Sequence, residues 1–206
     1  MPIEHYQFIE CKSPDCFLRF PGAEGIACPM CKSDTTLAAT RAKGYSGPKE
    51  TNDCHVELFL DNIRSAFNVG SILRTAEGAG VKKIYLAGIT PTPDHPSVLK
   101  TSLGAEKNIS WEKDLNSVRL AINLVKGGKE IWALERVGQS ISLATLRGEC
   151  LPDKKRVVLV VGNEVTGIDP GILEVSTKII HIPMHGEKIS LNVATAAGIA
   201  LFGLAN

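Results

Sequence analysis

The sequence lacks several features that would assign it at once to a common class of protein. Its net charge is only +1 over 206 residues, which excludes a chain that holds nucleic acid by bulk electrostatic attraction and leaves only a local basic patch. No cationic, apolar and small-residue series opens the chain, so we expect no signal peptide and a cytoplasmic protein. Because 44% of the residues are apolar, a hydrophobic core can form, and disorder is excluded as the main state.

The sequence also lacks a run of apolar residues long enough for a membrane anchor. The stretch Ile189–Ala205 has no charged residue, but it contains Ser190, Asn192, Thr195 and glycines. It falls short of the roughly 20 predominantly apolar residues that span a bilayer. We therefore expect a buried helix here and no membrane association.

The common nucleotide-binding motifs are absent. No G-x-G-x-x-G sequence follows a predicted strand, so a dinucleotide site would lack its fingerprint. Gly162 and Gly167 have the outer glycine spacing of a P-loop, but Ile168 and Asp169 stand where that motif has Lys and Ser or Thr. Without the lysine, binding of a nucleoside triphosphate is not expected.

Four of the six cysteines form two short-spaced pairs near the N-terminus, namely Cys11, Cys16, Cys28 and Cys31. Two such pairs can complete the tetrahedron of thiolates that Zn²⁺ prefers, and a site filled by four protein ligands is structural. A module of about 40 residues has too little core to fold alone, so the ion would supply the missing stability. The alternative of four unrelated thiols stays open at this point.

These spacings divide the chain into a zinc-ribbon-like module over residues 1–40, a polar linker over 41–51, and a larger domain over 52–206. The two remaining cysteines, Cys54 and Cys150, have no such neighbours and are expected to be small core residues. Residues 1–51 contain six Lys or Arg and six Asp or Glu, so the module is not strongly basic. If it touches RNA, Arg19 and the basic linker are the better candidates.

The larger domain alternates strand-like and helix-like patterns. Apolar runs that resemble strands buried on both faces begin at Val56, Lys83, Ile131, Val157 and Lys178. Between them lie two helical stripes, one of Val69, Ile72, Leu73, Ala76 and Ala79, and one of Leu115, Val118, Ala121, Ile122 and Val125. Alternation of this kind predicts an α/β domain with a parallel sheet.

Ligands of open α/β sheets bind beyond the carboxyl ends of the strands, so the segments that follow the strands are the candidate site. Asn68 is a plausible N-cap after the first strand, with Arg74 near the start of the same helix and off its apolar stripe. Glu164 could cap a helix or orient a ligand. Ser190 and Asn192 open the last helix, and Ser190 fits the N-cap position.

Three of these segments together resemble one family, the SpoU (TrmH-type) RNA 2′-O-ribose methyltransferases of the SPOUT superfamily. The segments, in order, are NVGSILRTAEGAGV, VVGNEVTGI and IPMHGEKISLNVATAAGIAL, and the resemblance covers roughly Val56 to Leu204. It implies methyl transfer from S-adenosylmethionine to a ribose 2′-hydroxyl of tRNA or rRNA, and a C-terminal trefoil knot. It also implies a homodimer whose active site is completed across the interface. The zinc-ribbon-like module lies outside the resemblance.

The resemblance also implies roles for individual residues. It places five residues in the catalytic site: Asn68, Arg74, Glu164, Ser190 and Asn192. It places four beside the cofactor: Leu134, Gly162, Ile182 and Leu191. An arginine is a poor base, so a grip on phosphate and on the developing alkoxide suits Arg74 better. A catalytically inactive RNA-binding protein of this fold and a knotted RNA base methyltransferase stay open as alternatives.

We predict that each chain binds one Zn²⁺ tightly through the four N-terminal cysteines, because two thiolate pairs close a tetrahedral site. Elemental analysis of metal-replete protein should find zinc, and Cys28→Ser should lower its occupancy. Zinc-free wild-type protein, or full occupancy in the variant, would contradict the assignment.

Overall fold

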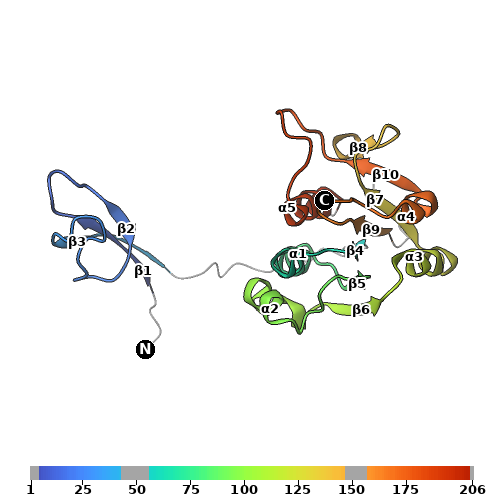
Figure 1. The fold of residues 1–206 in the computed structure, drawn as a ribbon. Helices are drawn as coiled ribbons and strands as arrows, with labels where there is room; N and C mark the ends of the chain where they lie inside the picture. Colours follow the sequence, from blue (N-terminus) through green and yellow to red (C-terminus); the bar gives the residue numbers. More distant parts are fainter. Residues whose placement is uncertain (1–4, 43–55, 147–156, 205–206) are drawn as a thin grey trace. The chain divides into compact units, whose positions relative to one another are not determined.

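The computed structural model describes residues 5–42, 56–146 and 157–204, which fall into two compact units. The first unit is Met1–Glu50 and the second is Thr51–Asn206, and each is described here by itself (Figure 1). Cys54 and Cys150, expected to be core residues, lie outside the described residues. Among the residues that are described, no helix has both the length and the apolar character to cross a membrane.

The first unit is a small antiparallel sheet with the strand order β2-β1-β3. Its strands are β1 (His5–Cys11), β2 (Arg19–Pro21) and β3 (Thr35–Ala42). The last two residues of β3 pair with the start of β1, Arg41 with Tyr6 and Ala42 with His5. The linker predicted from residue 41 therefore begins inside a strand, because backbone pairing continues where the sequence had already turned polar.

In the described part of the second unit, seven strands form one sheet with the order β6-β5-β4-β9-β7-β10-β8, and every pairing is parallel. The strands are β4 (Val56–Asp61), β5 (Lys83–Ala87), β6 (Ser110–Asp114), β7 (Glu130–Leu134), β8 (Ile141–Ser142), β9 (Val157–Val161) and β10 (Lys178–His181). The predicted α/β class with a parallel sheet is confirmed. The sequence missed β6, which is a polar edge strand, and β8, which has two residues.

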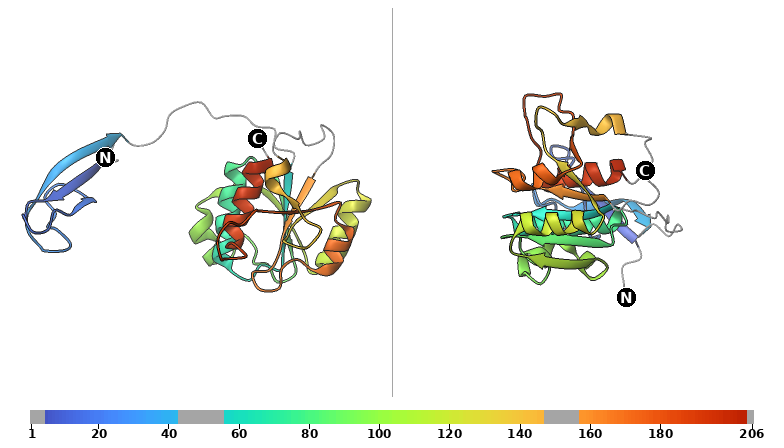
Figure 2. Two further views of the ribbon diagram at one scale, coloured as in Figure 1. Left: turned by 90° about the horizontal axis from the view of Figure 1, so that it is seen from above. Right: turned by 90° about the vertical axis from the view of Figure 1, so that its right-hand side faces the viewer.

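Helices cover both faces of this sheet (Figure 2). They are α1 (Ala66–Gly78), α2 (Pro96–Ser102), α3 (Ser117–Lys126), α4 (Pro170–Val175) and α5 (Val193–Leu204), with short 3₁₀ turns η1 (Ala105–Lys107) and η2 (Leu143–Leu146). Successive residues of β9 alternate between the two cores, since Leu159 packs in the cluster with α1 and α5 while Val158 and Val160 pack in the cluster with α3 and α4. The whole of β9 is buried, as a central parallel strand requires.

Three expectations about helix ends are wrong. Ser65, not Asn68, is the N-cap of α1: its hydroxyl accepts a hydrogen bond from the backbone N–H of Asn68. Helix α5 begins at Val193, so the charge-free stretch opens with an exposed loop rather than with the helix. Asn192 caps α5, because its side chain accepts a hydrogen bond from the N–H of Ala194. The spacing of small polar residues in the sequence could not show whether Ser190 or Asn192 is the cap.

The stripe predicted for α3 is only partly right. Ala121 is buried and Val118 packs against the core, but Leu115 precedes the helix and is 81% exposed, and the buried Leu120 was not in the stripe. The cause is the N-cap at Asn116, whose side chain accepts from the N–H of Arg119 and sets the start of the helix.

The predicted SPOUT class includes a trefoil knot at the C-terminal end. The path of the chain between η2 and β9 includes residues 147–156, which lie outside the described residues. The knot therefore stays a prediction for this chain.

A glycine fixes the distance between α1 and α2. A Cβ atom at Gly70 would lie 2.0 Å from the Thr101 Oγ1 and 2.3 Å from the backbone oxygen of Val98, so neither helix leaves room for a side chain. The Thr101 hydroxyl donates a hydrogen bond to the backbone oxygen of Phe67 at this crossing. Close packing places α2 directly beside the helix that begins at the candidate site.

We predict that Gly70→Ala lowers the free energy of unfolding of the second unit by about 1–3 kcal/mol, because the methyl group overpacks the crossing. Gly78→Ala is the matched control, since a Cβ there meets nothing within 4 Å, and it should be neutral or stabilising. Chemical denaturation followed by tryptophan fluorescence isolates this unit, because both tryptophans, Trp111 and Trp132, belong to it. Equal stabilities of the two variants would contradict the packing argument.

Candidate functional site

A cavity of about 440 Å³ opens at the carboxyl ends of three neighbouring strands of the sheet. Leu134 closes β7, Val161 closes β9 and His181 closes β10, and all three line the cavity together with the loops that follow β9 and β10. This is the edge at which open α/β sheets bind their ligands.

The structure brings most of the predicted site residues to this cavity. Its described lining includes Leu134, Gly162, Glu164, Ile182, Ser190, Leu191 and Asn192. Asn68 stands outside that lining but is hydrogen-bonded to two of its members. Arg74 is in neither group.

Side chains from three distant segments form a chain of hydrogen bonds at the rim. The Asn68 Nδ2 donates to the Glu164 Oε1 over 2.9 Å, and the Asn192 Nδ2 donates to the Asn68 Oδ1 over 3.1 Å. These bonds join the start of α1, the loop after β9 and the start of α5. They link residues separated by 96 and 124 positions in the sequence.

The Glu164 carboxylate also covers the N-terminal end of α1. It accepts hydrogen bonds from the backbone N–H groups of Arg64 at 2.9 Å and Ser65 at 3.1 Å. Partial burial alone would raise the pKa of Glu164, but the hydrogen bonds from Arg64 and Asn68 outweigh it and lower that pKa below its usual range. A negative charge is also favourable beside a helix N-terminus. Glu164 thus caps a helix from another loop, while Asp169 caps the helix that follows it.

The loop after β9 has no room for side chains at its base. A Cβ atom at Gly162 would lie 2.4 Å from the backbone carbon of Gly167, and Asn163 and Gly167 exchange two backbone hydrogen bonds of 3.0 Å. The Oε2 of Glu135, the residue after β7, accepts a hydrogen bond from the N–H of Ile168 over 3.1 Å and holds the far end of the loop. The glycine is therefore required by a close backbone approach.

Sequence reasoning missed three residues of this site. Glu135 fixes the loop after β9, and the Asn163 Nδ2 donates to the backbone oxygen of Asn62 over 2.7 Å. The His181 Nδ1 is buried at the cavity and, within the described residues, has no hydrogen-bond partner. Glu135 and His181 each stand at the end of a predicted strand, and that position was the signal that could have found them.

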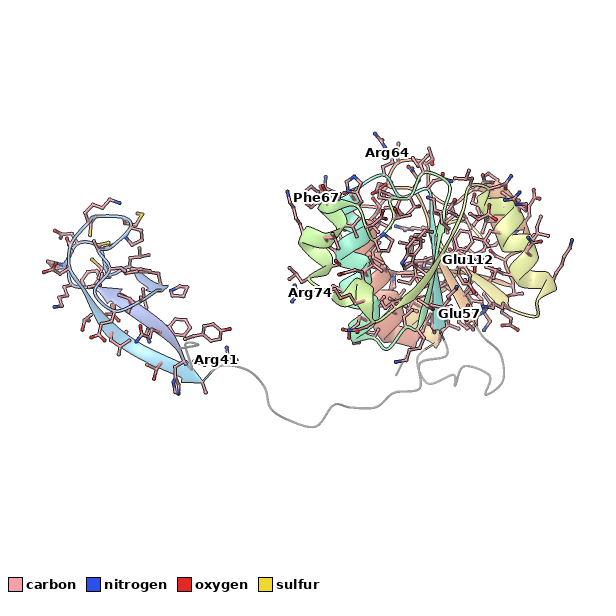
Figure 3. All side chains as sticks on the ribbon, turned by 90° about the horizontal axis from the view of Figure 1, so that it is seen from below. Arg41, Glu57, Arg64, Phe67, Arg74 and Glu112 are labelled. Carbon is pink, nitrogen blue, oxygen red and sulfur yellow. The ribbon has the colours of Figure 1, made fainter. Side chains whose placement is uncertain are left out.

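Arg74 lies away from the cavity. It is the ninth residue of α1, well past the start of the helix, and its side chain is exposed. Six residues of helix separate it from Asn68, which is about 9 Å along the axis and about two thirds of a turn around it. Figure 3 shows Arg74 toward the opposite end of the unit from Arg64, which precedes α1. Within one subunit, the fold does not bring Arg74 to the other predicted residues.

The four N-terminal cysteines converge at one end of the first unit (Figure 3, yellow atoms). Their sulfur atoms all lie within 4.8 Å of one another, with 3.3 Å from Cys11 to Cys31 and 3.7 Å from Cys16 to Cys28. These distances are too long for disulfides, whose sulfurs are about 2.05 Å apart. Four sulfurs about 2.3 Å from a tetrahedral ion would be about 3.8 Å from one another, so the donor set fits zinc.

The surroundings of the cluster favour a thiolate at one position. Hydrogen bonds from the side chain and the backbone of Ser33 lower the pKa of the Cys31 thiol to about 6. Thiolates are the form in which cysteine binds metal. The described residues thus provide a cluster that could hold a metal ion.

The second unit is a SPOUT-type α/β protein by its sheet, its covering helices and its cavity. The chain belongs to the SpoU rRNA Methylase family, which matches residues 55–202. It is 32% identical over 151 residues to the tRNA (guanosine(18)-2′-O)-methyltransferase of Aquifex aeolicus, a match that covers 70% of this chain and 66% of the relative. It is 33% identical over 146 residues to an uncharacterized tRNA/rRNA methyltransferase of Borreliella burgdorferi, covering 70% of this chain and 61% of the relative.

Solved structures agree with this assignment. The crystal structure of the Aquifex aeolicus TrmH/SpoU tRNA modifying enzyme superposes with a TM-score of 0.64 at 30% identity, over 75% of each chain. The AdoMet-bound rRNA methyltransferase of Sinorhizobium meliloti gives 0.66 at 28% identity, over 75% of this chain and 56% of that one. Both likenesses support the SPOUT fold expected from the sequence.

We predict that Glu164→Gln destabilises the second unit by about 1 kcal/mol near neutral pH, because it removes the charge that the N–H groups bind. A carboxylate whose pKa is depressed by folding stabilises the fold above its unfolded pKa, and that contribution is lost as the pH falls through the folded value. The difference from wild type should therefore shrink below about pH 4.5. Denaturation of both proteins across this range measures it.

Glu187→Gln serves as the control, since Glu187 is exposed in the loop before α5. A loss of stability in Glu164→Gln that persists unchanged in acid would show that its cause is steric rather than electrostatic.

Proposed function

We propose that this chain transfers a methyl group from S-adenosylmethionine to a ribose 2′-hydroxyl of tRNA or rRNA. The observation that carries the proposal is the cavity at the strand ends, with a rim tied together by Asn68, Glu164 and Asn192 in a SpoU-family chain. The named activities of the relatives support the same chemistry.

The cavity fits a ligand of this size and polarity. Its volume is within the roughly 300–1,000 Å³ of small-molecule sites, and Leu134, Ile182 and Leu191 offer apolar walls. The His181 Nδ1, which has no hydrogen-bond partner among the described residues, would give a bound molecule one polar partner, and Gly162 also lines the cavity. S-adenosylmethionine would supply an electrophilic methyl group carried on a sulfonium.

The protein's contribution to such a reaction is mainly positioning. The ribose oxygen must approach in line, and holding reactants in this geometry removes a large part of the barrier. Glu164 is a poor general base because its lowered pKa keeps it weakly basic and its oxygens already accept hydrogen bonds. In the proposal Glu164 fixes Asn68, Asn68 fixes Asn192, and Ser190, on the exposed loop beside them, orients the ribose.

The proposal includes a homodimer. Phe67 on α1 is 54% exposed and Ile199 on α5 is 43% exposed, and such side chains on neighbouring helices are typical of an interface. A second subunit would also account for Arg74, which is remote from the cavity of its own subunit. We assign Arg74 to the partner's site, where its guanidinium would grip a phosphate and stabilise the developing alkoxide.

The proposal also includes a structural Zn²⁺ on Cys11, Cys16, Cys28 and Cys31, and a cytoplasmic location. The sulfur distances support the ion. None of the described cysteines forms a disulfide, and this and an RNA substrate suit a reducing compartment.

The direct test is incubation of the protein with labelled S-adenosylmethionine and fractionated cellular RNA, followed by digestion to nucleosides. The proposal expects label on the ribose of one fraction. Label on a base would instead identify a base methyltransferase. If calorimetry detected no binding of S-adenosylmethionine while the protein still bound RNA, it would be an inactive RNA-binding protein.

We predict that Arg74→Ala abolishes methyl transfer and leaves S-adenosylmethionine affinity within about twofold, because a contact made in the transition state affects turnover rather than ground-state binding. Lys126→Ala, which removes an exposed charge on the opposite helical layer, should be active. Calorimetry and the transfer assay measure the two quantities. A parallel loss of affinity would make Arg74 a cofactor or folding residue.

Mixing variants tests the dimer. Equal amounts of Arg74→Ala and Asn192→Ala subunits, refolded together, should recover about a quarter of wild-type activity, because half of the dimers then contain one intact composite site. No recovery would show that Arg74 acts within its own subunit.

A further inference from the structure

The two faces of the small sheet in the first unit differ in how they are covered. Ile9 of β1 is fully buried and pairs with Phe20 of β2, on the face over which the loop after β2 folds. In that loop, a Cβ atom at Gly22 would lie 2.6 Å from the Ile26 side chain and 3.2 Å from the Phe20 ring. The Thr35 hydroxyl holds the loop by donating to the backbone oxygen of Ile26.

The opposite face carries aromatic rings between arginines. Side chains alternate along a strand, so Tyr6, Phe8 and Glu10 point away from the side of Ile9. Directly paired residues share a face, and the register pairs Tyr6 with Arg41 and Glu10 with Arg19. We call Tyr6, Phe8, Arg19 and Arg41 the aromatic face.

This face is accessible within its unit. Tyr6 is 52% exposed, Phe8 is half-buried, and Arg41 is exposed at the end of the sheet remote from the cysteine sulfurs (Figure 3). The Arg19 side chain is 53% exposed and reaches Glu10 only at 3.7 Å, a surface pair that competes weakly with another anion. The face thus presents two rings and two guanidinium groups against one carboxylate.

We propose that the aromatic face binds a single-stranded segment of the RNA substrate by stacking its bases. Every base has a surface that stacks on an aromatic ring, and arginines beside such rings hold the phosphates between bases. Tyr6 and Phe8 lie about 7 Å apart along β1, so each ring can hold a different base. The inference rests on the proposed function, which supplies the RNA.

A duplex is disfavoured as the occupant. Duplex binding depends on many phosphate contacts, and residues 1–51 contain as many acidic as basic side chains. Zinc held by four thiolates adds further negative charge at the cysteine end. The aromatic face itself offers only Arg19 and Arg41 for phosphate contacts, so its rings would have to supply much of the affinity, and rings stack on unpaired bases.

The test uses the full-length, zinc-loaded protein and a fluorescein-labelled single-stranded RNA of roughly 12 nucleotides. Anisotropy should show that Tyr6→Ala weakens binding about tenfold with an unchanged salt slope, because stacking is lost. Arg41→Ala should weaken binding and lower the salt slope by about one, because a phosphate contact is lost. Tyr6→Phe should retain affinity, and Tyr6→Leu should not.

Lys12→Ala is the matched control, since it removes one exposed charge from the same unit outside the aromatic face, and its affinity should equal that of wild type. Zinc content shows that each variant is folded, and the Tyr6→Phe and Tyr6→Leu pair separates stacking from packing. Calorimetry should find S-adenosylmethionine affinity unchanged in every variant.

Three results would overturn the inference and are distinguishable from one another. Wild-type affinity in both Tyr6→Ala and Arg41→Ala, with methyl transfer intact, would dismiss the aromatic face but leave the proposed function. Equal affinity for a duplex of the same sequence would dismiss single-strand recognition. Absence of RNA binding and of methyl transfer in the wild type would instead remove the proposed function itself.

Discussion

Burial of β9 on both faces is the constraint on which the second unit depends. Val158 and Val160 pack toward α3 and α4, while Leu159 and Val161 pack toward α1 and α5, so the strand holds two cores together. A parallel strand in this position requires crossover connections, and these bring the carboxyl ends of β7, β9 and β10 to one edge. The cavity is a consequence of that arrangement.

The rim of the cavity shows how a few polar contacts convert this edge into a defined site. Glu164 accepts hydrogen bonds from the backbone at the start of α1 and from the Asn68 side chain. Asn68 in turn accepts a hydrogen bond from Asn192 at the start of α5. Each group is both a structural partner and a candidate for substrate contact, so stability and positioning are coupled here. Such coupling is expected where the side chains that touch a substrate are held in position by hydrogen bonds from neighbouring residues.

The first unit reaches a defined fold by a different route. A sheet of three short strands buries few of the described residues completely, Ile9 and Cys28 among them, and the proposed Zn²⁺ on the four converging sulfurs would take the place of a larger core. Because the unit is small, one face of its sheet is not covered by other residues of the unit. A face of this kind that carries aromatic rings and arginines is suited to binding a ligand. In the proposal for the aromatic face, structural and recognition roles are separated on two sides of one sheet.

The sequence by itself determined the class of the second unit, its central strands and the pairing of short-spaced cysteines, because continuous apolar runs and close spacings are local signals. It also placed Glu164, Asn192 and Gly162 in segments that follow strands. Only the tertiary structure decided that Ser65 caps α1, that Glu164 bonds to Asn68, and that Arg74 lies away from the cavity. These facts depend on where distant segments meet and on the rotation of a helix about its axis, and a local pattern contains neither.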